Sequence, residues 1–374
     1  MTYTIKKVET KKEARIFTDL PVKLFGHIDA FVPALAMDEM NVFDPKKNPA
    51  HEYCDSVRFL AYNEKKEVVG RIGGIINHKY NEAKGTKIVR FTRLDMIDDI
   101  EVTKLLLQAV INWGHEQGLN HMIGPIGFTD MDRMGMLIEG FEQLGTFITI
   151  WNPPYYKEHL ENLGFEKDVD WIETKIQWPT EVPERISRGV EVVKQRYGYK
   201  LVKLKSIKEL DKYIYDAFDV YNEAFNHLYG FFPVTRAVED YYIKQMKSLV
   251  VLKYLWFVTD ANDKVVGFGL MMPSLAMANK KNKGKLFPFG WIRILRAIKK
   301  YDVVDFYFIA VDPKHQNHGV LAFMIEDGIK LGIQDGVKFA ETGPELEHNR
   351  TIQAQWAKFD LEIHKRRRCW KKDI

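Results

Sequence analysis

A short loop between an apolar strand and a helical pattern holds the residues best suited to bind an anion. The apolar run 309–311 leads into this loop, and helical spacing begins near Val320. Backbone N–H groups at such a junction converge on phosphate, and a helix N-terminus favours negative charge. The stretch predicts a diphosphate site, with an ordinary strand-to-helix turn as the alternative. Its expected contacts are Val311, Gln316, Asn317, His318, Gly319, Val320 and Leu321.

A second group of residues suits the binding of an organic substrate. Trp151-Asn-Pro-Pro-Tyr-Tyr156 places rigid aromatic rings on a loop. Such rings can line an apolar pocket, and Trp151, Tyr155 and Tyr156 are therefore candidate substrate contacts. The alternative is that the same rings pack in the core at a junction between domains.

The elements that position these residues occur twice along the chain. Thr10 with Glu13, and Ser206 with Glu209, each have the spacing of a capping box at a helix start. Two hairpin patterns follow, and in each the second strand opens with Val-Val-Gly, ending at Gly70 or Gly267. The two copies are offset by 196 residues at the first device and by 197 at the second. An internal repeat of this kind predicts two similar domains.

The repeat continues through a helix, a strand and a second helix. Apolar residues follow helical spacing in 102–113 and again in 321–332. A short strand then runs to Gly-Pro, where the offset is 219, and a last helix begins at Asn152 or Asn349, where it is again 197. Prolines around 179–183 indicate the boundary, followed by a connecting helix over 184–197. We therefore predict domains at 1–178 and 179–374.

This order of elements resembles the GNAT superfamily of acyl-CoA-dependent N-acyltransferases. The second copy carries the closest match, an apolar strand ending in Val-x-Pro and then Gln316-x-x-Gly319, although Leu321 stands where that family usually has Gly or Ala. Nearly the whole chain is further similar to bacterial tandem-GNAT proteins of unassigned substrate. That similarity rests on Leu137–Phe141, Trp151–Tyr156 and Leu286–Gly290. The resemblance implies an α/β (α+β) fold of two tandem domains with mixed, mostly antiparallel sheets flanked by helices.

The resemblance also implies a chemistry for the second copy. Acetyl-CoA, or another acyl-CoA, would be the co-substrate, and an amine would attack its thioester directly, without a metal. Glu341, at the end of a strand, is the first candidate for the base that takes the amine's proton. Glu345 is a candidate substrate contact and alternative acid, and Asn349 a further cofactor contact. Trp356 stands in the slot where the family usually has a Tyr that protonates the thiolate.

The first copy departs further from the pattern. The corresponding stretch, 91–100, contains no glycine, and Asp95, Asp98 and Asp99 would repel a diphosphate. These acids also favour the start of a helix. We expect the first copy to be a degenerate partner that does not bind the cofactor.

Two basic segments suggest other partners. Residues 280–300 contain eight Lys or Arg and no acid, interleaved with aromatic and aliphatic residues. This segment could contact an anionic membrane, cover the acyl site, or pack on the other domain. The tail His364–Lys372 reads as a closing strand with its charges on a solvated face, or as a nucleic-acid patch.

Composition narrows the class of protein. The formal net charge of +4 gives little support to a nucleic-acid partner. Two cysteines cannot form a disulfide framework, and no Cys/His cluster has metal-ligand spacing. With no apolar leader at the N-terminus, we expect a cytoplasmic protein. We predict transfer of an acyl group to a small-molecule or peptide amine. The alternatives are non-catalytic binding of an acyl-CoA or metabolite, and acyl transfer from a charged tRNA or onto a lipid. The sequence leaves the oligomeric state open.

Overall fold

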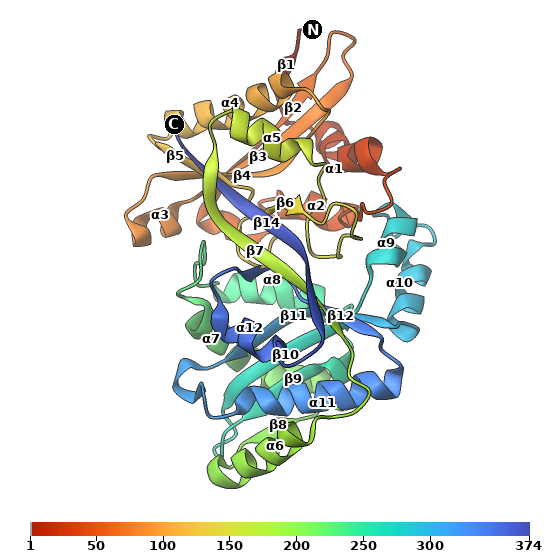
Figure 1. The fold of residues 1–374 in the computed structure, drawn as a ribbon. Helices are drawn as coiled ribbons and strands as arrows, with labels where there is room; N and C mark the ends of the chain where they lie inside the picture. Colours follow the sequence, from red (N-terminus) through yellow and green to blue (C-terminus); the bar gives the residue numbers. More distant parts are fainter. Residues whose placement is uncertain (1) are drawn as a thin grey trace.

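A single continuous β-sheet runs the length of the molecule in the computed structural model, which describes residues 2–374 (Figure 1). The sheet has 14 strands within those residues, in the order β1-β2-β3-β4-β5-β14-β7-β12-β11-β10-β9-β8, with β6 attached to β14 and β13 to β7. Only β4–β5 and β11–β12 pair in parallel. The predicted α/β class, with mixed, mostly antiparallel sheets flanked by helices, is confirmed.

Residues 2–178, here the N-terminal half, form these elements: β1 (Thr4–Lys7), α1 (Lys11–Phe25), α2 (Ala36–Val42), η1 (Pro49–Glu52), β2 (Cys54–Tyr62), β3 (Val68–Asn77), α3 (His78–Lys84), β4 (Ile88–Met96), α4 (Ile100–Glu116), β5 (His121–Gly124), β6 (Met136–Glu139), α5 (Tyr155–Asn162) and β7 (Glu166–Gln177).

Residues 179–374, the C-terminal half, form these elements: α6 (Glu184–Tyr197), β8 (Lys200–Val202), η2 (Ile207–Lys212), α7 (Ile214–Phe225), α8 (Arg236–Met246), η3 (Leu252–Tyr254), β9 (Leu255–Thr259), β10 (Val265–Pro273), α9 (Ala276–Asn282), α10 (Gly290–Lys299), β11 (Val303–Val311), η4 (Pro313–His315), α11 (Val320–Asp335), β12 (Phe339–Glu341), β13 (Glu345–Leu346), α12 (Arg350–Trp356) and β14 (Leu361–Asp373).

The two halves exchange their last strands. β14, the end of the chain, pairs with β5 and β6 of the N-terminal half, while β7 pairs with β12 of the C-terminal half. β7 and β14 also pair with each other in a long antiparallel ladder that crosses the centre of the molecule (Figure 1). Backbone hydrogen bonds therefore join the halves directly. The boundary at residue 178 stays a prediction from the sequence repeat.

Local sequence signals explain some helix starts. Thr10 accepts from the Glu13 amide and Glu13 accepts from the Thr10 amide, so the first capping box is present. The second is wrong: Ser206 starts a 3-10 helix without a side-chain cap, and the α-helix begins only at Ile214. The connecting helix is confirmed over 184–197.

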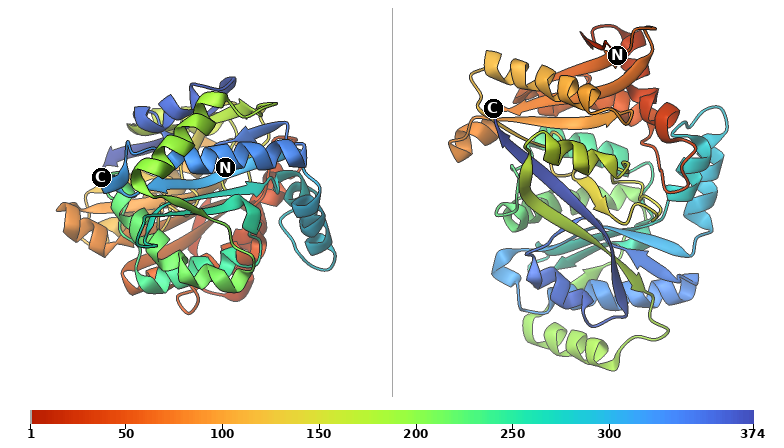
Figure 2. Two further views of the ribbon diagram at one scale, coloured as in Figure 1. Left: turned by 90° about the horizontal axis from the view of Figure 1, so that it is seen from below. Right: turned by 45° about the horizontal axis from the view of Figure 1, so that its top comes forward.

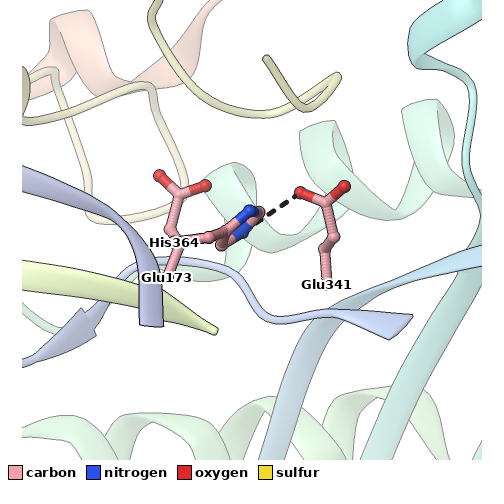
Figure 3. Close-up of side chains that lie close together, drawn as sticks. All are labelled: Glu173, Glu341 and His364. Atoms are coloured by element: carbon pink, nitrogen blue, oxygen red, sulfur yellow. Dashed lines mark ion pairs between the residues drawn. The ribbon is translucent and has the colours of Figure 1, made fainter. Parts of the chain in front are cut away.

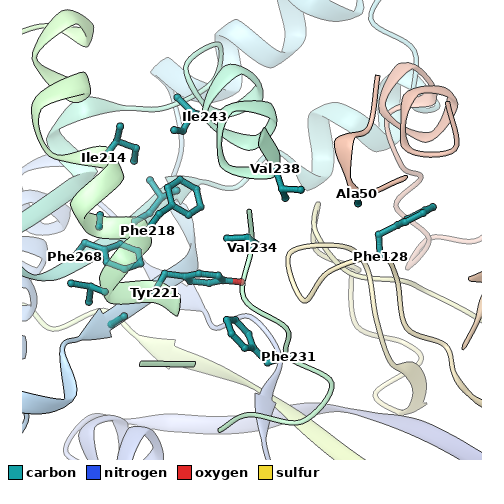
Figure 4. Close-up of a cluster of buried hydrophobic side chains, with 14 of the residues drawn as sticks. Ala50, Phe128, Ile214, Phe218, Tyr221, Phe231, Val234, Val238, Ile243 and Phe268 are labelled. Atoms are coloured by element: carbon teal, nitrogen blue, oxygen red, sulfur yellow. The ribbon is translucent and has the colours of Figure 1, made fainter. Parts of the chain in front are cut away.

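The main apolar core is shared by the two halves. Ala50 and Phe128 from the N-terminal half belong to one buried cluster with Phe218, Tyr221 and Val238 from α7 and α8 (Figure 4). Burial of apolar surface contributes about 25 cal/mol per Å², so a core that spans both halves holds them together strongly. The site described next lies against this shared core.

None of the helices within residues 2–374 combines the length and the apolar character that crossing a bilayer requires.

Candidate active site

The sheet opens where β11 and β12 part. Their parallel pairing covers three residues and ends with Asp305 opposite Glu341, followed by one bond from the Gly343 amide to the Phe306 carbonyl at 3.2 Å. β13 then pairs with β7 instead of β11. On its other side β11 bulges at Tyr307, where the register against β10 shifts. The distal part of β11 therefore faces open space on the β12 side.

The predicted diphosphate loop lies at the far end of β11. Gly319 has a left-handed φ of 80° and is followed directly by α11, which has no side-chain cap and no acid in its first turn. The first N–H groups of an α-helix have no partner within the helix, so those of α11 are available to an anion. Gln316 and Asn317 are exposed beside them. The loop fits a diphosphate.

Helix α6 packs against one side of this loop. A Cβ added at Gly319 would meet Val193 at 2.6 Å, and the His318 ring stacks on Tyr197 at 4.7 Å between centroids. The His318 amide donates to the His315 carbonyl at 3.3 Å, so this predicted donor is already engaged. Gly319 is thus required both for its left-handed conformation and for the close approach of α6.

Trp356 lies beside the opening and orients an acid. Its indole Nε1 donates to Glu345 Oε1 at 2.7 Å, and its ring packs on Phe306 with centroids 5.1 Å apart. Glu345 Oε2 is buried without a hydrogen-bond partner within residues 2–374. Burial raises the pKa of Glu345 to about 7, against the opposing hydrogen bond from Trp356. Such a carboxyl group can exchange a proton near neutral pH.

A large cavity opens from this point into the junction of the two halves. Its volume is about 1230 Å³, and Thr342–Glu345, Asn349 and Trp356 form its edge at the sheet opening. The wall is mainly apolar and includes residues of α7, α8, β10 and β11, together with residues of the N-terminal half such as Leu35, Met131 and Phe147. A cavity of this size and lining suits a long apolar molecule.

Charged residues of both signs line the cavity, among them Lys46, Lys47 and Lys244 as well as several acids. Asp38 and Asp130 line the cavity with Glu345. Burial raises the pKa of Asp130 to about 6 and also raises that of Asp38. A buried carboxyl group beside a mainly apolar wall, such as Glu345, favours a ligand with a cationic or amine head.

Glu341, the first candidate base, belongs to a buried ion network instead. Lys365 Nζ lies 2.9 Å from Glu341 Oε2 and 3.1 Å from Glu173 Oε2, and Arg367 pairs with the other oxygen of Glu173. Lys365 and Arg367 are 1% and 0% exposed. The expected solvated face of the tail strand is therefore wrong at these two residues, because β14 is inserted in the middle of the sheet.

The same region contains three side chains at metal-binding distance. Ligand atoms of Glu173, Glu341 and His364 lie within 4.8 Å of one another (Figure 3). Lys365 already balances both acids, and its ammonium would repel a divalent cation. Burial lowers the pKa of His364 to about 4, while burial and the charge of Glu341 raise the pKa of Asp305 to about 8. Both pKa shifts favour the neutral forms of His364 and Asp305 around the ion pairs of Lys365 and Arg367.

The aromatic cluster predicted as a substrate contact lies elsewhere. Trp151 and Tyr156 are buried in the N-terminal core, where both rings pack against Phe25. The Tyr155 hydroxyl donates to the Met96 carbonyl at 2.7 Å, and the Tyr156 hydroxyl accepts from the Met96 amide at 2.9 Å. None of these three aromatic residues lines the junction cavity. Trp151 and Tyr156 line a separate cavity of about 60 Å³ in the N-terminal half.

The remaining predicted residues lie around the C-terminal opening. Val311 ends β11 opposite Gly267, Val320 is buried and Leu321 half-buried, and Asn349 caps α12 by accepting from the Ile352 amide at 3.4 Å. The structure thus brings together Glu345, Asn349 and Trp356 at one end of β11, and the glycine loop at the other.

Comparison with solved structures identifies the architecture. A tandem GNAT protein from the clavulanic acid biosynthesis pathway superimposes with a TM-score of 0.57, covering 100% of this chain and 98% of its own, at 12% identity. The chain has the tandem GNAT fold. The predicted resemblance of fold is therefore confirmed.

Sequence relatives of the chain are distant. The bacterial ceramide synthase of Caulobacter vibrioides is 26% identical over 297 residues, which are 78% of this chain and 75% of that protein. Protein YghO of Escherichia coli is 25% identical over 292 residues, which are 77% and 73% of the two chains. No family model matches the sequence.

Sequence reasoning missed several residues of the junction cavity in this tandem GNAT fold. Asp38, Asp130 and the α7–α8 aromatic side chains carry no motif, because they meet only when the two halves dock. One signal was present: α7 and its surroundings are unusually rich in aromatic residues, with Phe218, Tyr221 and Phe225 at helical spacing.

Proposed function

We propose that this protein is an acyl-CoA-dependent N-acyltransferase that acylates a long-chain amine, with its reaction centre at the β11–β12 opening of the C-terminal half. The observation that carries the proposal is the 1230 Å³ apolar cavity that ends at Glu345. A relative named bacterial ceramide synthase, 26% identical, supports an apolar substrate. The tandem GNAT fold supports the acyl-CoA co-substrate.

The cavity would bind the acceptor by its chain and place its amine at the polar edge. Apolar burial drives the chain inward, at about 0.8 kcal/mol per buried methylene. The amine must lose a proton before it can react. Glu345 takes that proton, because its carboxyl has a pKa of about 7 and an unpartnered Oε2. Trp356 holds the other oxygen and so fixes the carboxyl in place.

The co-substrate would be held by the glycine loop. The amides of Gly319, Val320 and Leu321 would bind its diphosphate, with Gln316 and Asn317 beside them. Acyl-CoA, when bound, would supply the acyl group as a thioester: the new C–N bond replaces the C–S bond, and coenzyme A leaves as a thiol with the proton that the amine has lost. The volume of the junction cavity favours a long acyl chain over acetyl-CoA alone.

A product assay tests the proposal. Purified protein is incubated with acyl-CoAs and amines of graded chain length, and the amide is measured by mass spectrometry. We expect amide formation to rise with amine length. No amide from any pair, under conditions where acyl-CoA binds, would refute the proposed catalysis.

A cavity-filling variant sharpens this assay. Leu249 lines the cavity and is only half-buried, so Leu249→Trp reduces the space with limited cost to the core. We expect KM for long amines to rise about tenfold while short amines, the internal control, are unaffected. Equal effects on both would contradict the assigned role of the cavity.

A second candidate function is binding of an acyl-CoA without transfer. The observation that favours it is Trp356 in the usual Tyr slot, because an indole cannot protonate a thiolate. Calorimetric binding of acyl-CoA without product from any amine would support this alternative.

A further inference from the structure

A helical hairpin at the flank of the C-terminal half presents an apolar outer face. α9 and α10 form it with their connecting turn, and it projects from the body of the molecule in both views of Figure 2. Its inner face is buried through Leu275, Ala278 and Ile294. Its outer face is not covered.

The exposed residues of this hairpin are large and apolar. Phe287 is 77% exposed, Phe289 68%, Met277 50%, Leu295 46% and Trp291 45%. Trp291 and Leu295 are four residues apart and lie on one side of α10. The hairpin thus carries five of the ten large apolar side chains exposed within residues 2–374. A cluster of this kind marks an interaction site rather than random exposure.

Positive charge surrounds the apolar face. Residues 280–300 contain eight Lys or Arg and no acid. Asp29 of the N-terminal half neutralises Lys280, at 3.1 Å. Lys281, Lys285 and Lys299 are exposed and form no ion pair within the described chain. The face therefore combines insertable rings with cations that complement an anionic surface.

The hairpin is fixed to the body and is not a loose arm. Asn279 donates to the Pro33 carbonyl at 2.6 Å, and the Ala36 amide donates to the Gly284 carbonyl at 2.9 Å. Leu275, Leu286 and Ile294 of the same hairpin line the junction cavity. One side of the hairpin thus faces the cavity and the other faces solvent.

We propose that the hairpin 275–300 docks this protein on the surface of an anionic lipid membrane. Phe287, Phe289 and Trp291 enter the boundary between headgroups and acyl chains, and the surrounding lysines and arginines contact anionic headgroups. Docking places the cavity beside a source of long-chain molecules. The inference does not depend on catalysis, since the surface exists whether or not acyl transfer occurs.

Vesicle binding tests the inference on the full chain. The protein is sedimented with phosphatidylcholine vesicles, with or without phosphatidylglycerol, at low and high salt. We expect binding only with phosphatidylglycerol, and less of it at high salt. Trp291 is the exposed tryptophan among residues 2–374, so brominated lipid should quench part of the fluorescence in the wild type and much less in Trp291→Phe.

Two sets of variants separate the parts of the surface. Lys281→Gln, Lys285→Gln and Lys299→Gln together should weaken vesicle binding at least about tenfold. The matched control removes three charges from the distant helix α6, as Arg185→Gln, Lys194→Gln and Arg196→Gln, and should change binding less than about twofold. Phe287→Ser with Phe289→Ser should weaken it at least about tenfold, and Val192→Ser, at another exposed apolar side chain, should not.

The outcomes are distinct. Absence of wild-type binding to phosphatidylglycerol vesicles, or equal losses in the hairpin and α6 variants, would overturn the inference. Binding of an acidic protein to the hairpin with no vesicle binding would also overturn it. Loss of acyl transfer with normal vesicle binding would refute only the proposed function.

Discussion

The N-termini of α4 and α11, which are equivalent helices of the two halves, differ in whether a side chain caps their backbone amides. At the start of α4, Asp99 accepts from the Glu101 amide at 2.9 Å, and Asp98 lies beside it. At the start of α11, Gly319 offers no side chain and no acid follows in the first turn. The start of α4 is thus capped by its own acid, whereas the start of α11 has no side-chain cap.

The openings in the sheet differ in the same way. In the N-terminal half, the Tyr155 and Tyr156 hydroxyls bond the backbone of Met96, and the cavity that Tyr156 lines has a volume of only about 60 Å³. In the C-terminal half, Trp356 bonds a side chain, Glu345, at the edge of a cavity. Ile126 occupies the position after Gly-Pro that Glu345 occupies in the second copy. The comparison teaches that the same elements form a small, enclosed space in the N-terminal half and a large cavity edged by Glu345 in the C-terminal half.

Removal of the proposed base should have the largest effect. Glu345→Gln keeps the hydrogen bond from Trp356 but cannot take a proton, so the acyl-transfer rate should fall about 10²- to 10⁴-fold. In the wild type the rate should decline as pH falls below about 7, because Glu345 then becomes protonated. Initial rates across pH measure both. A Glu341→Gln variant with the larger loss would move the base to that residue.

Breaking the ion network between the exchanged strands should be nearly as costly. Arg367→Met leaves Glu173 buried with less compensation and should lower the free energy of unfolding by about 3–5 kcal/mol. Arg366→Met, on the neighbouring half-exposed residue, should cost about 1 kcal/mol or less. Urea denaturation compares them, and equal losses would contradict the role of burial.

The network also predicts a pH dependence. Burial alone would raise the pKa of Glu173, but Arg367 and Lys365 hold it at about 2. A depressed pKa contributes stability above the unfolded value, about 4.3, and that stability is lost as pH falls toward 2. Arg367→Met should therefore lose less stability than the wild type between these values.

Acids placed in the loop before α11 should make it resemble the acidic loop before α4. Gln316→Glu with Asn317→Asp adds two charges near the amides of α11 while preserving size, and acyl-CoA affinity should fall about ten- to thirtyfold. The difference should shrink at high salt. Calorimetry measures it, and Asp98→Asn in the N-terminal half is the control that should leave affinity unchanged. An equal change of acyl-CoA affinity in the Asp98→Asn variant would contradict the assignment of the cofactor to the C-terminal half.

The smallest effect is expected from removing the side-chain cap at the start of α4. Asp99→Ala removes the cap of α4 and should lower stability by about 1 kcal/mol without creating acyl-CoA binding. Thermal or urea unfolding measures the loss. No loss would show that the acid does not stabilise this helix.

The sequence could predict the elements better than their arrangement. Repeated hairpins, the α4 and α11 patterns and the 184–197 helix follow from local periodicity and caps, and all are present. The ladder between β7 and β14 could not be predicted, because strand pairing depends on contacts far apart in sequence. For the same reason Lys365 and Arg367 looked solvated.

The candidate site also combines features that a local pattern predicts with features that depend on the tertiary structure. The glycine loop is a local device, and its position between strand and helix was readable from Gln316 and Gly319. Glu345 could be predicted only as a substrate contact or an alternative acid, because its raised pKa comes from burial in the folded protein. The cavity itself needs residues from both halves, such as Phe147 and Phe218, which no local pattern connects.

The position of β14 has a consequence for synthesis on the ribosome. The sheet of the N-terminal half is completed by Leu361–Asp373, which are synthesised after every other strand of that half. The two halves therefore cannot fold one after the other as independent units, as the domains of multidomain proteins commonly do. A nascent chain that stops before Leu361 would leave β5 and β7 each with an unpaired edge, so a stop codon at that point should be as damaging as one near the middle.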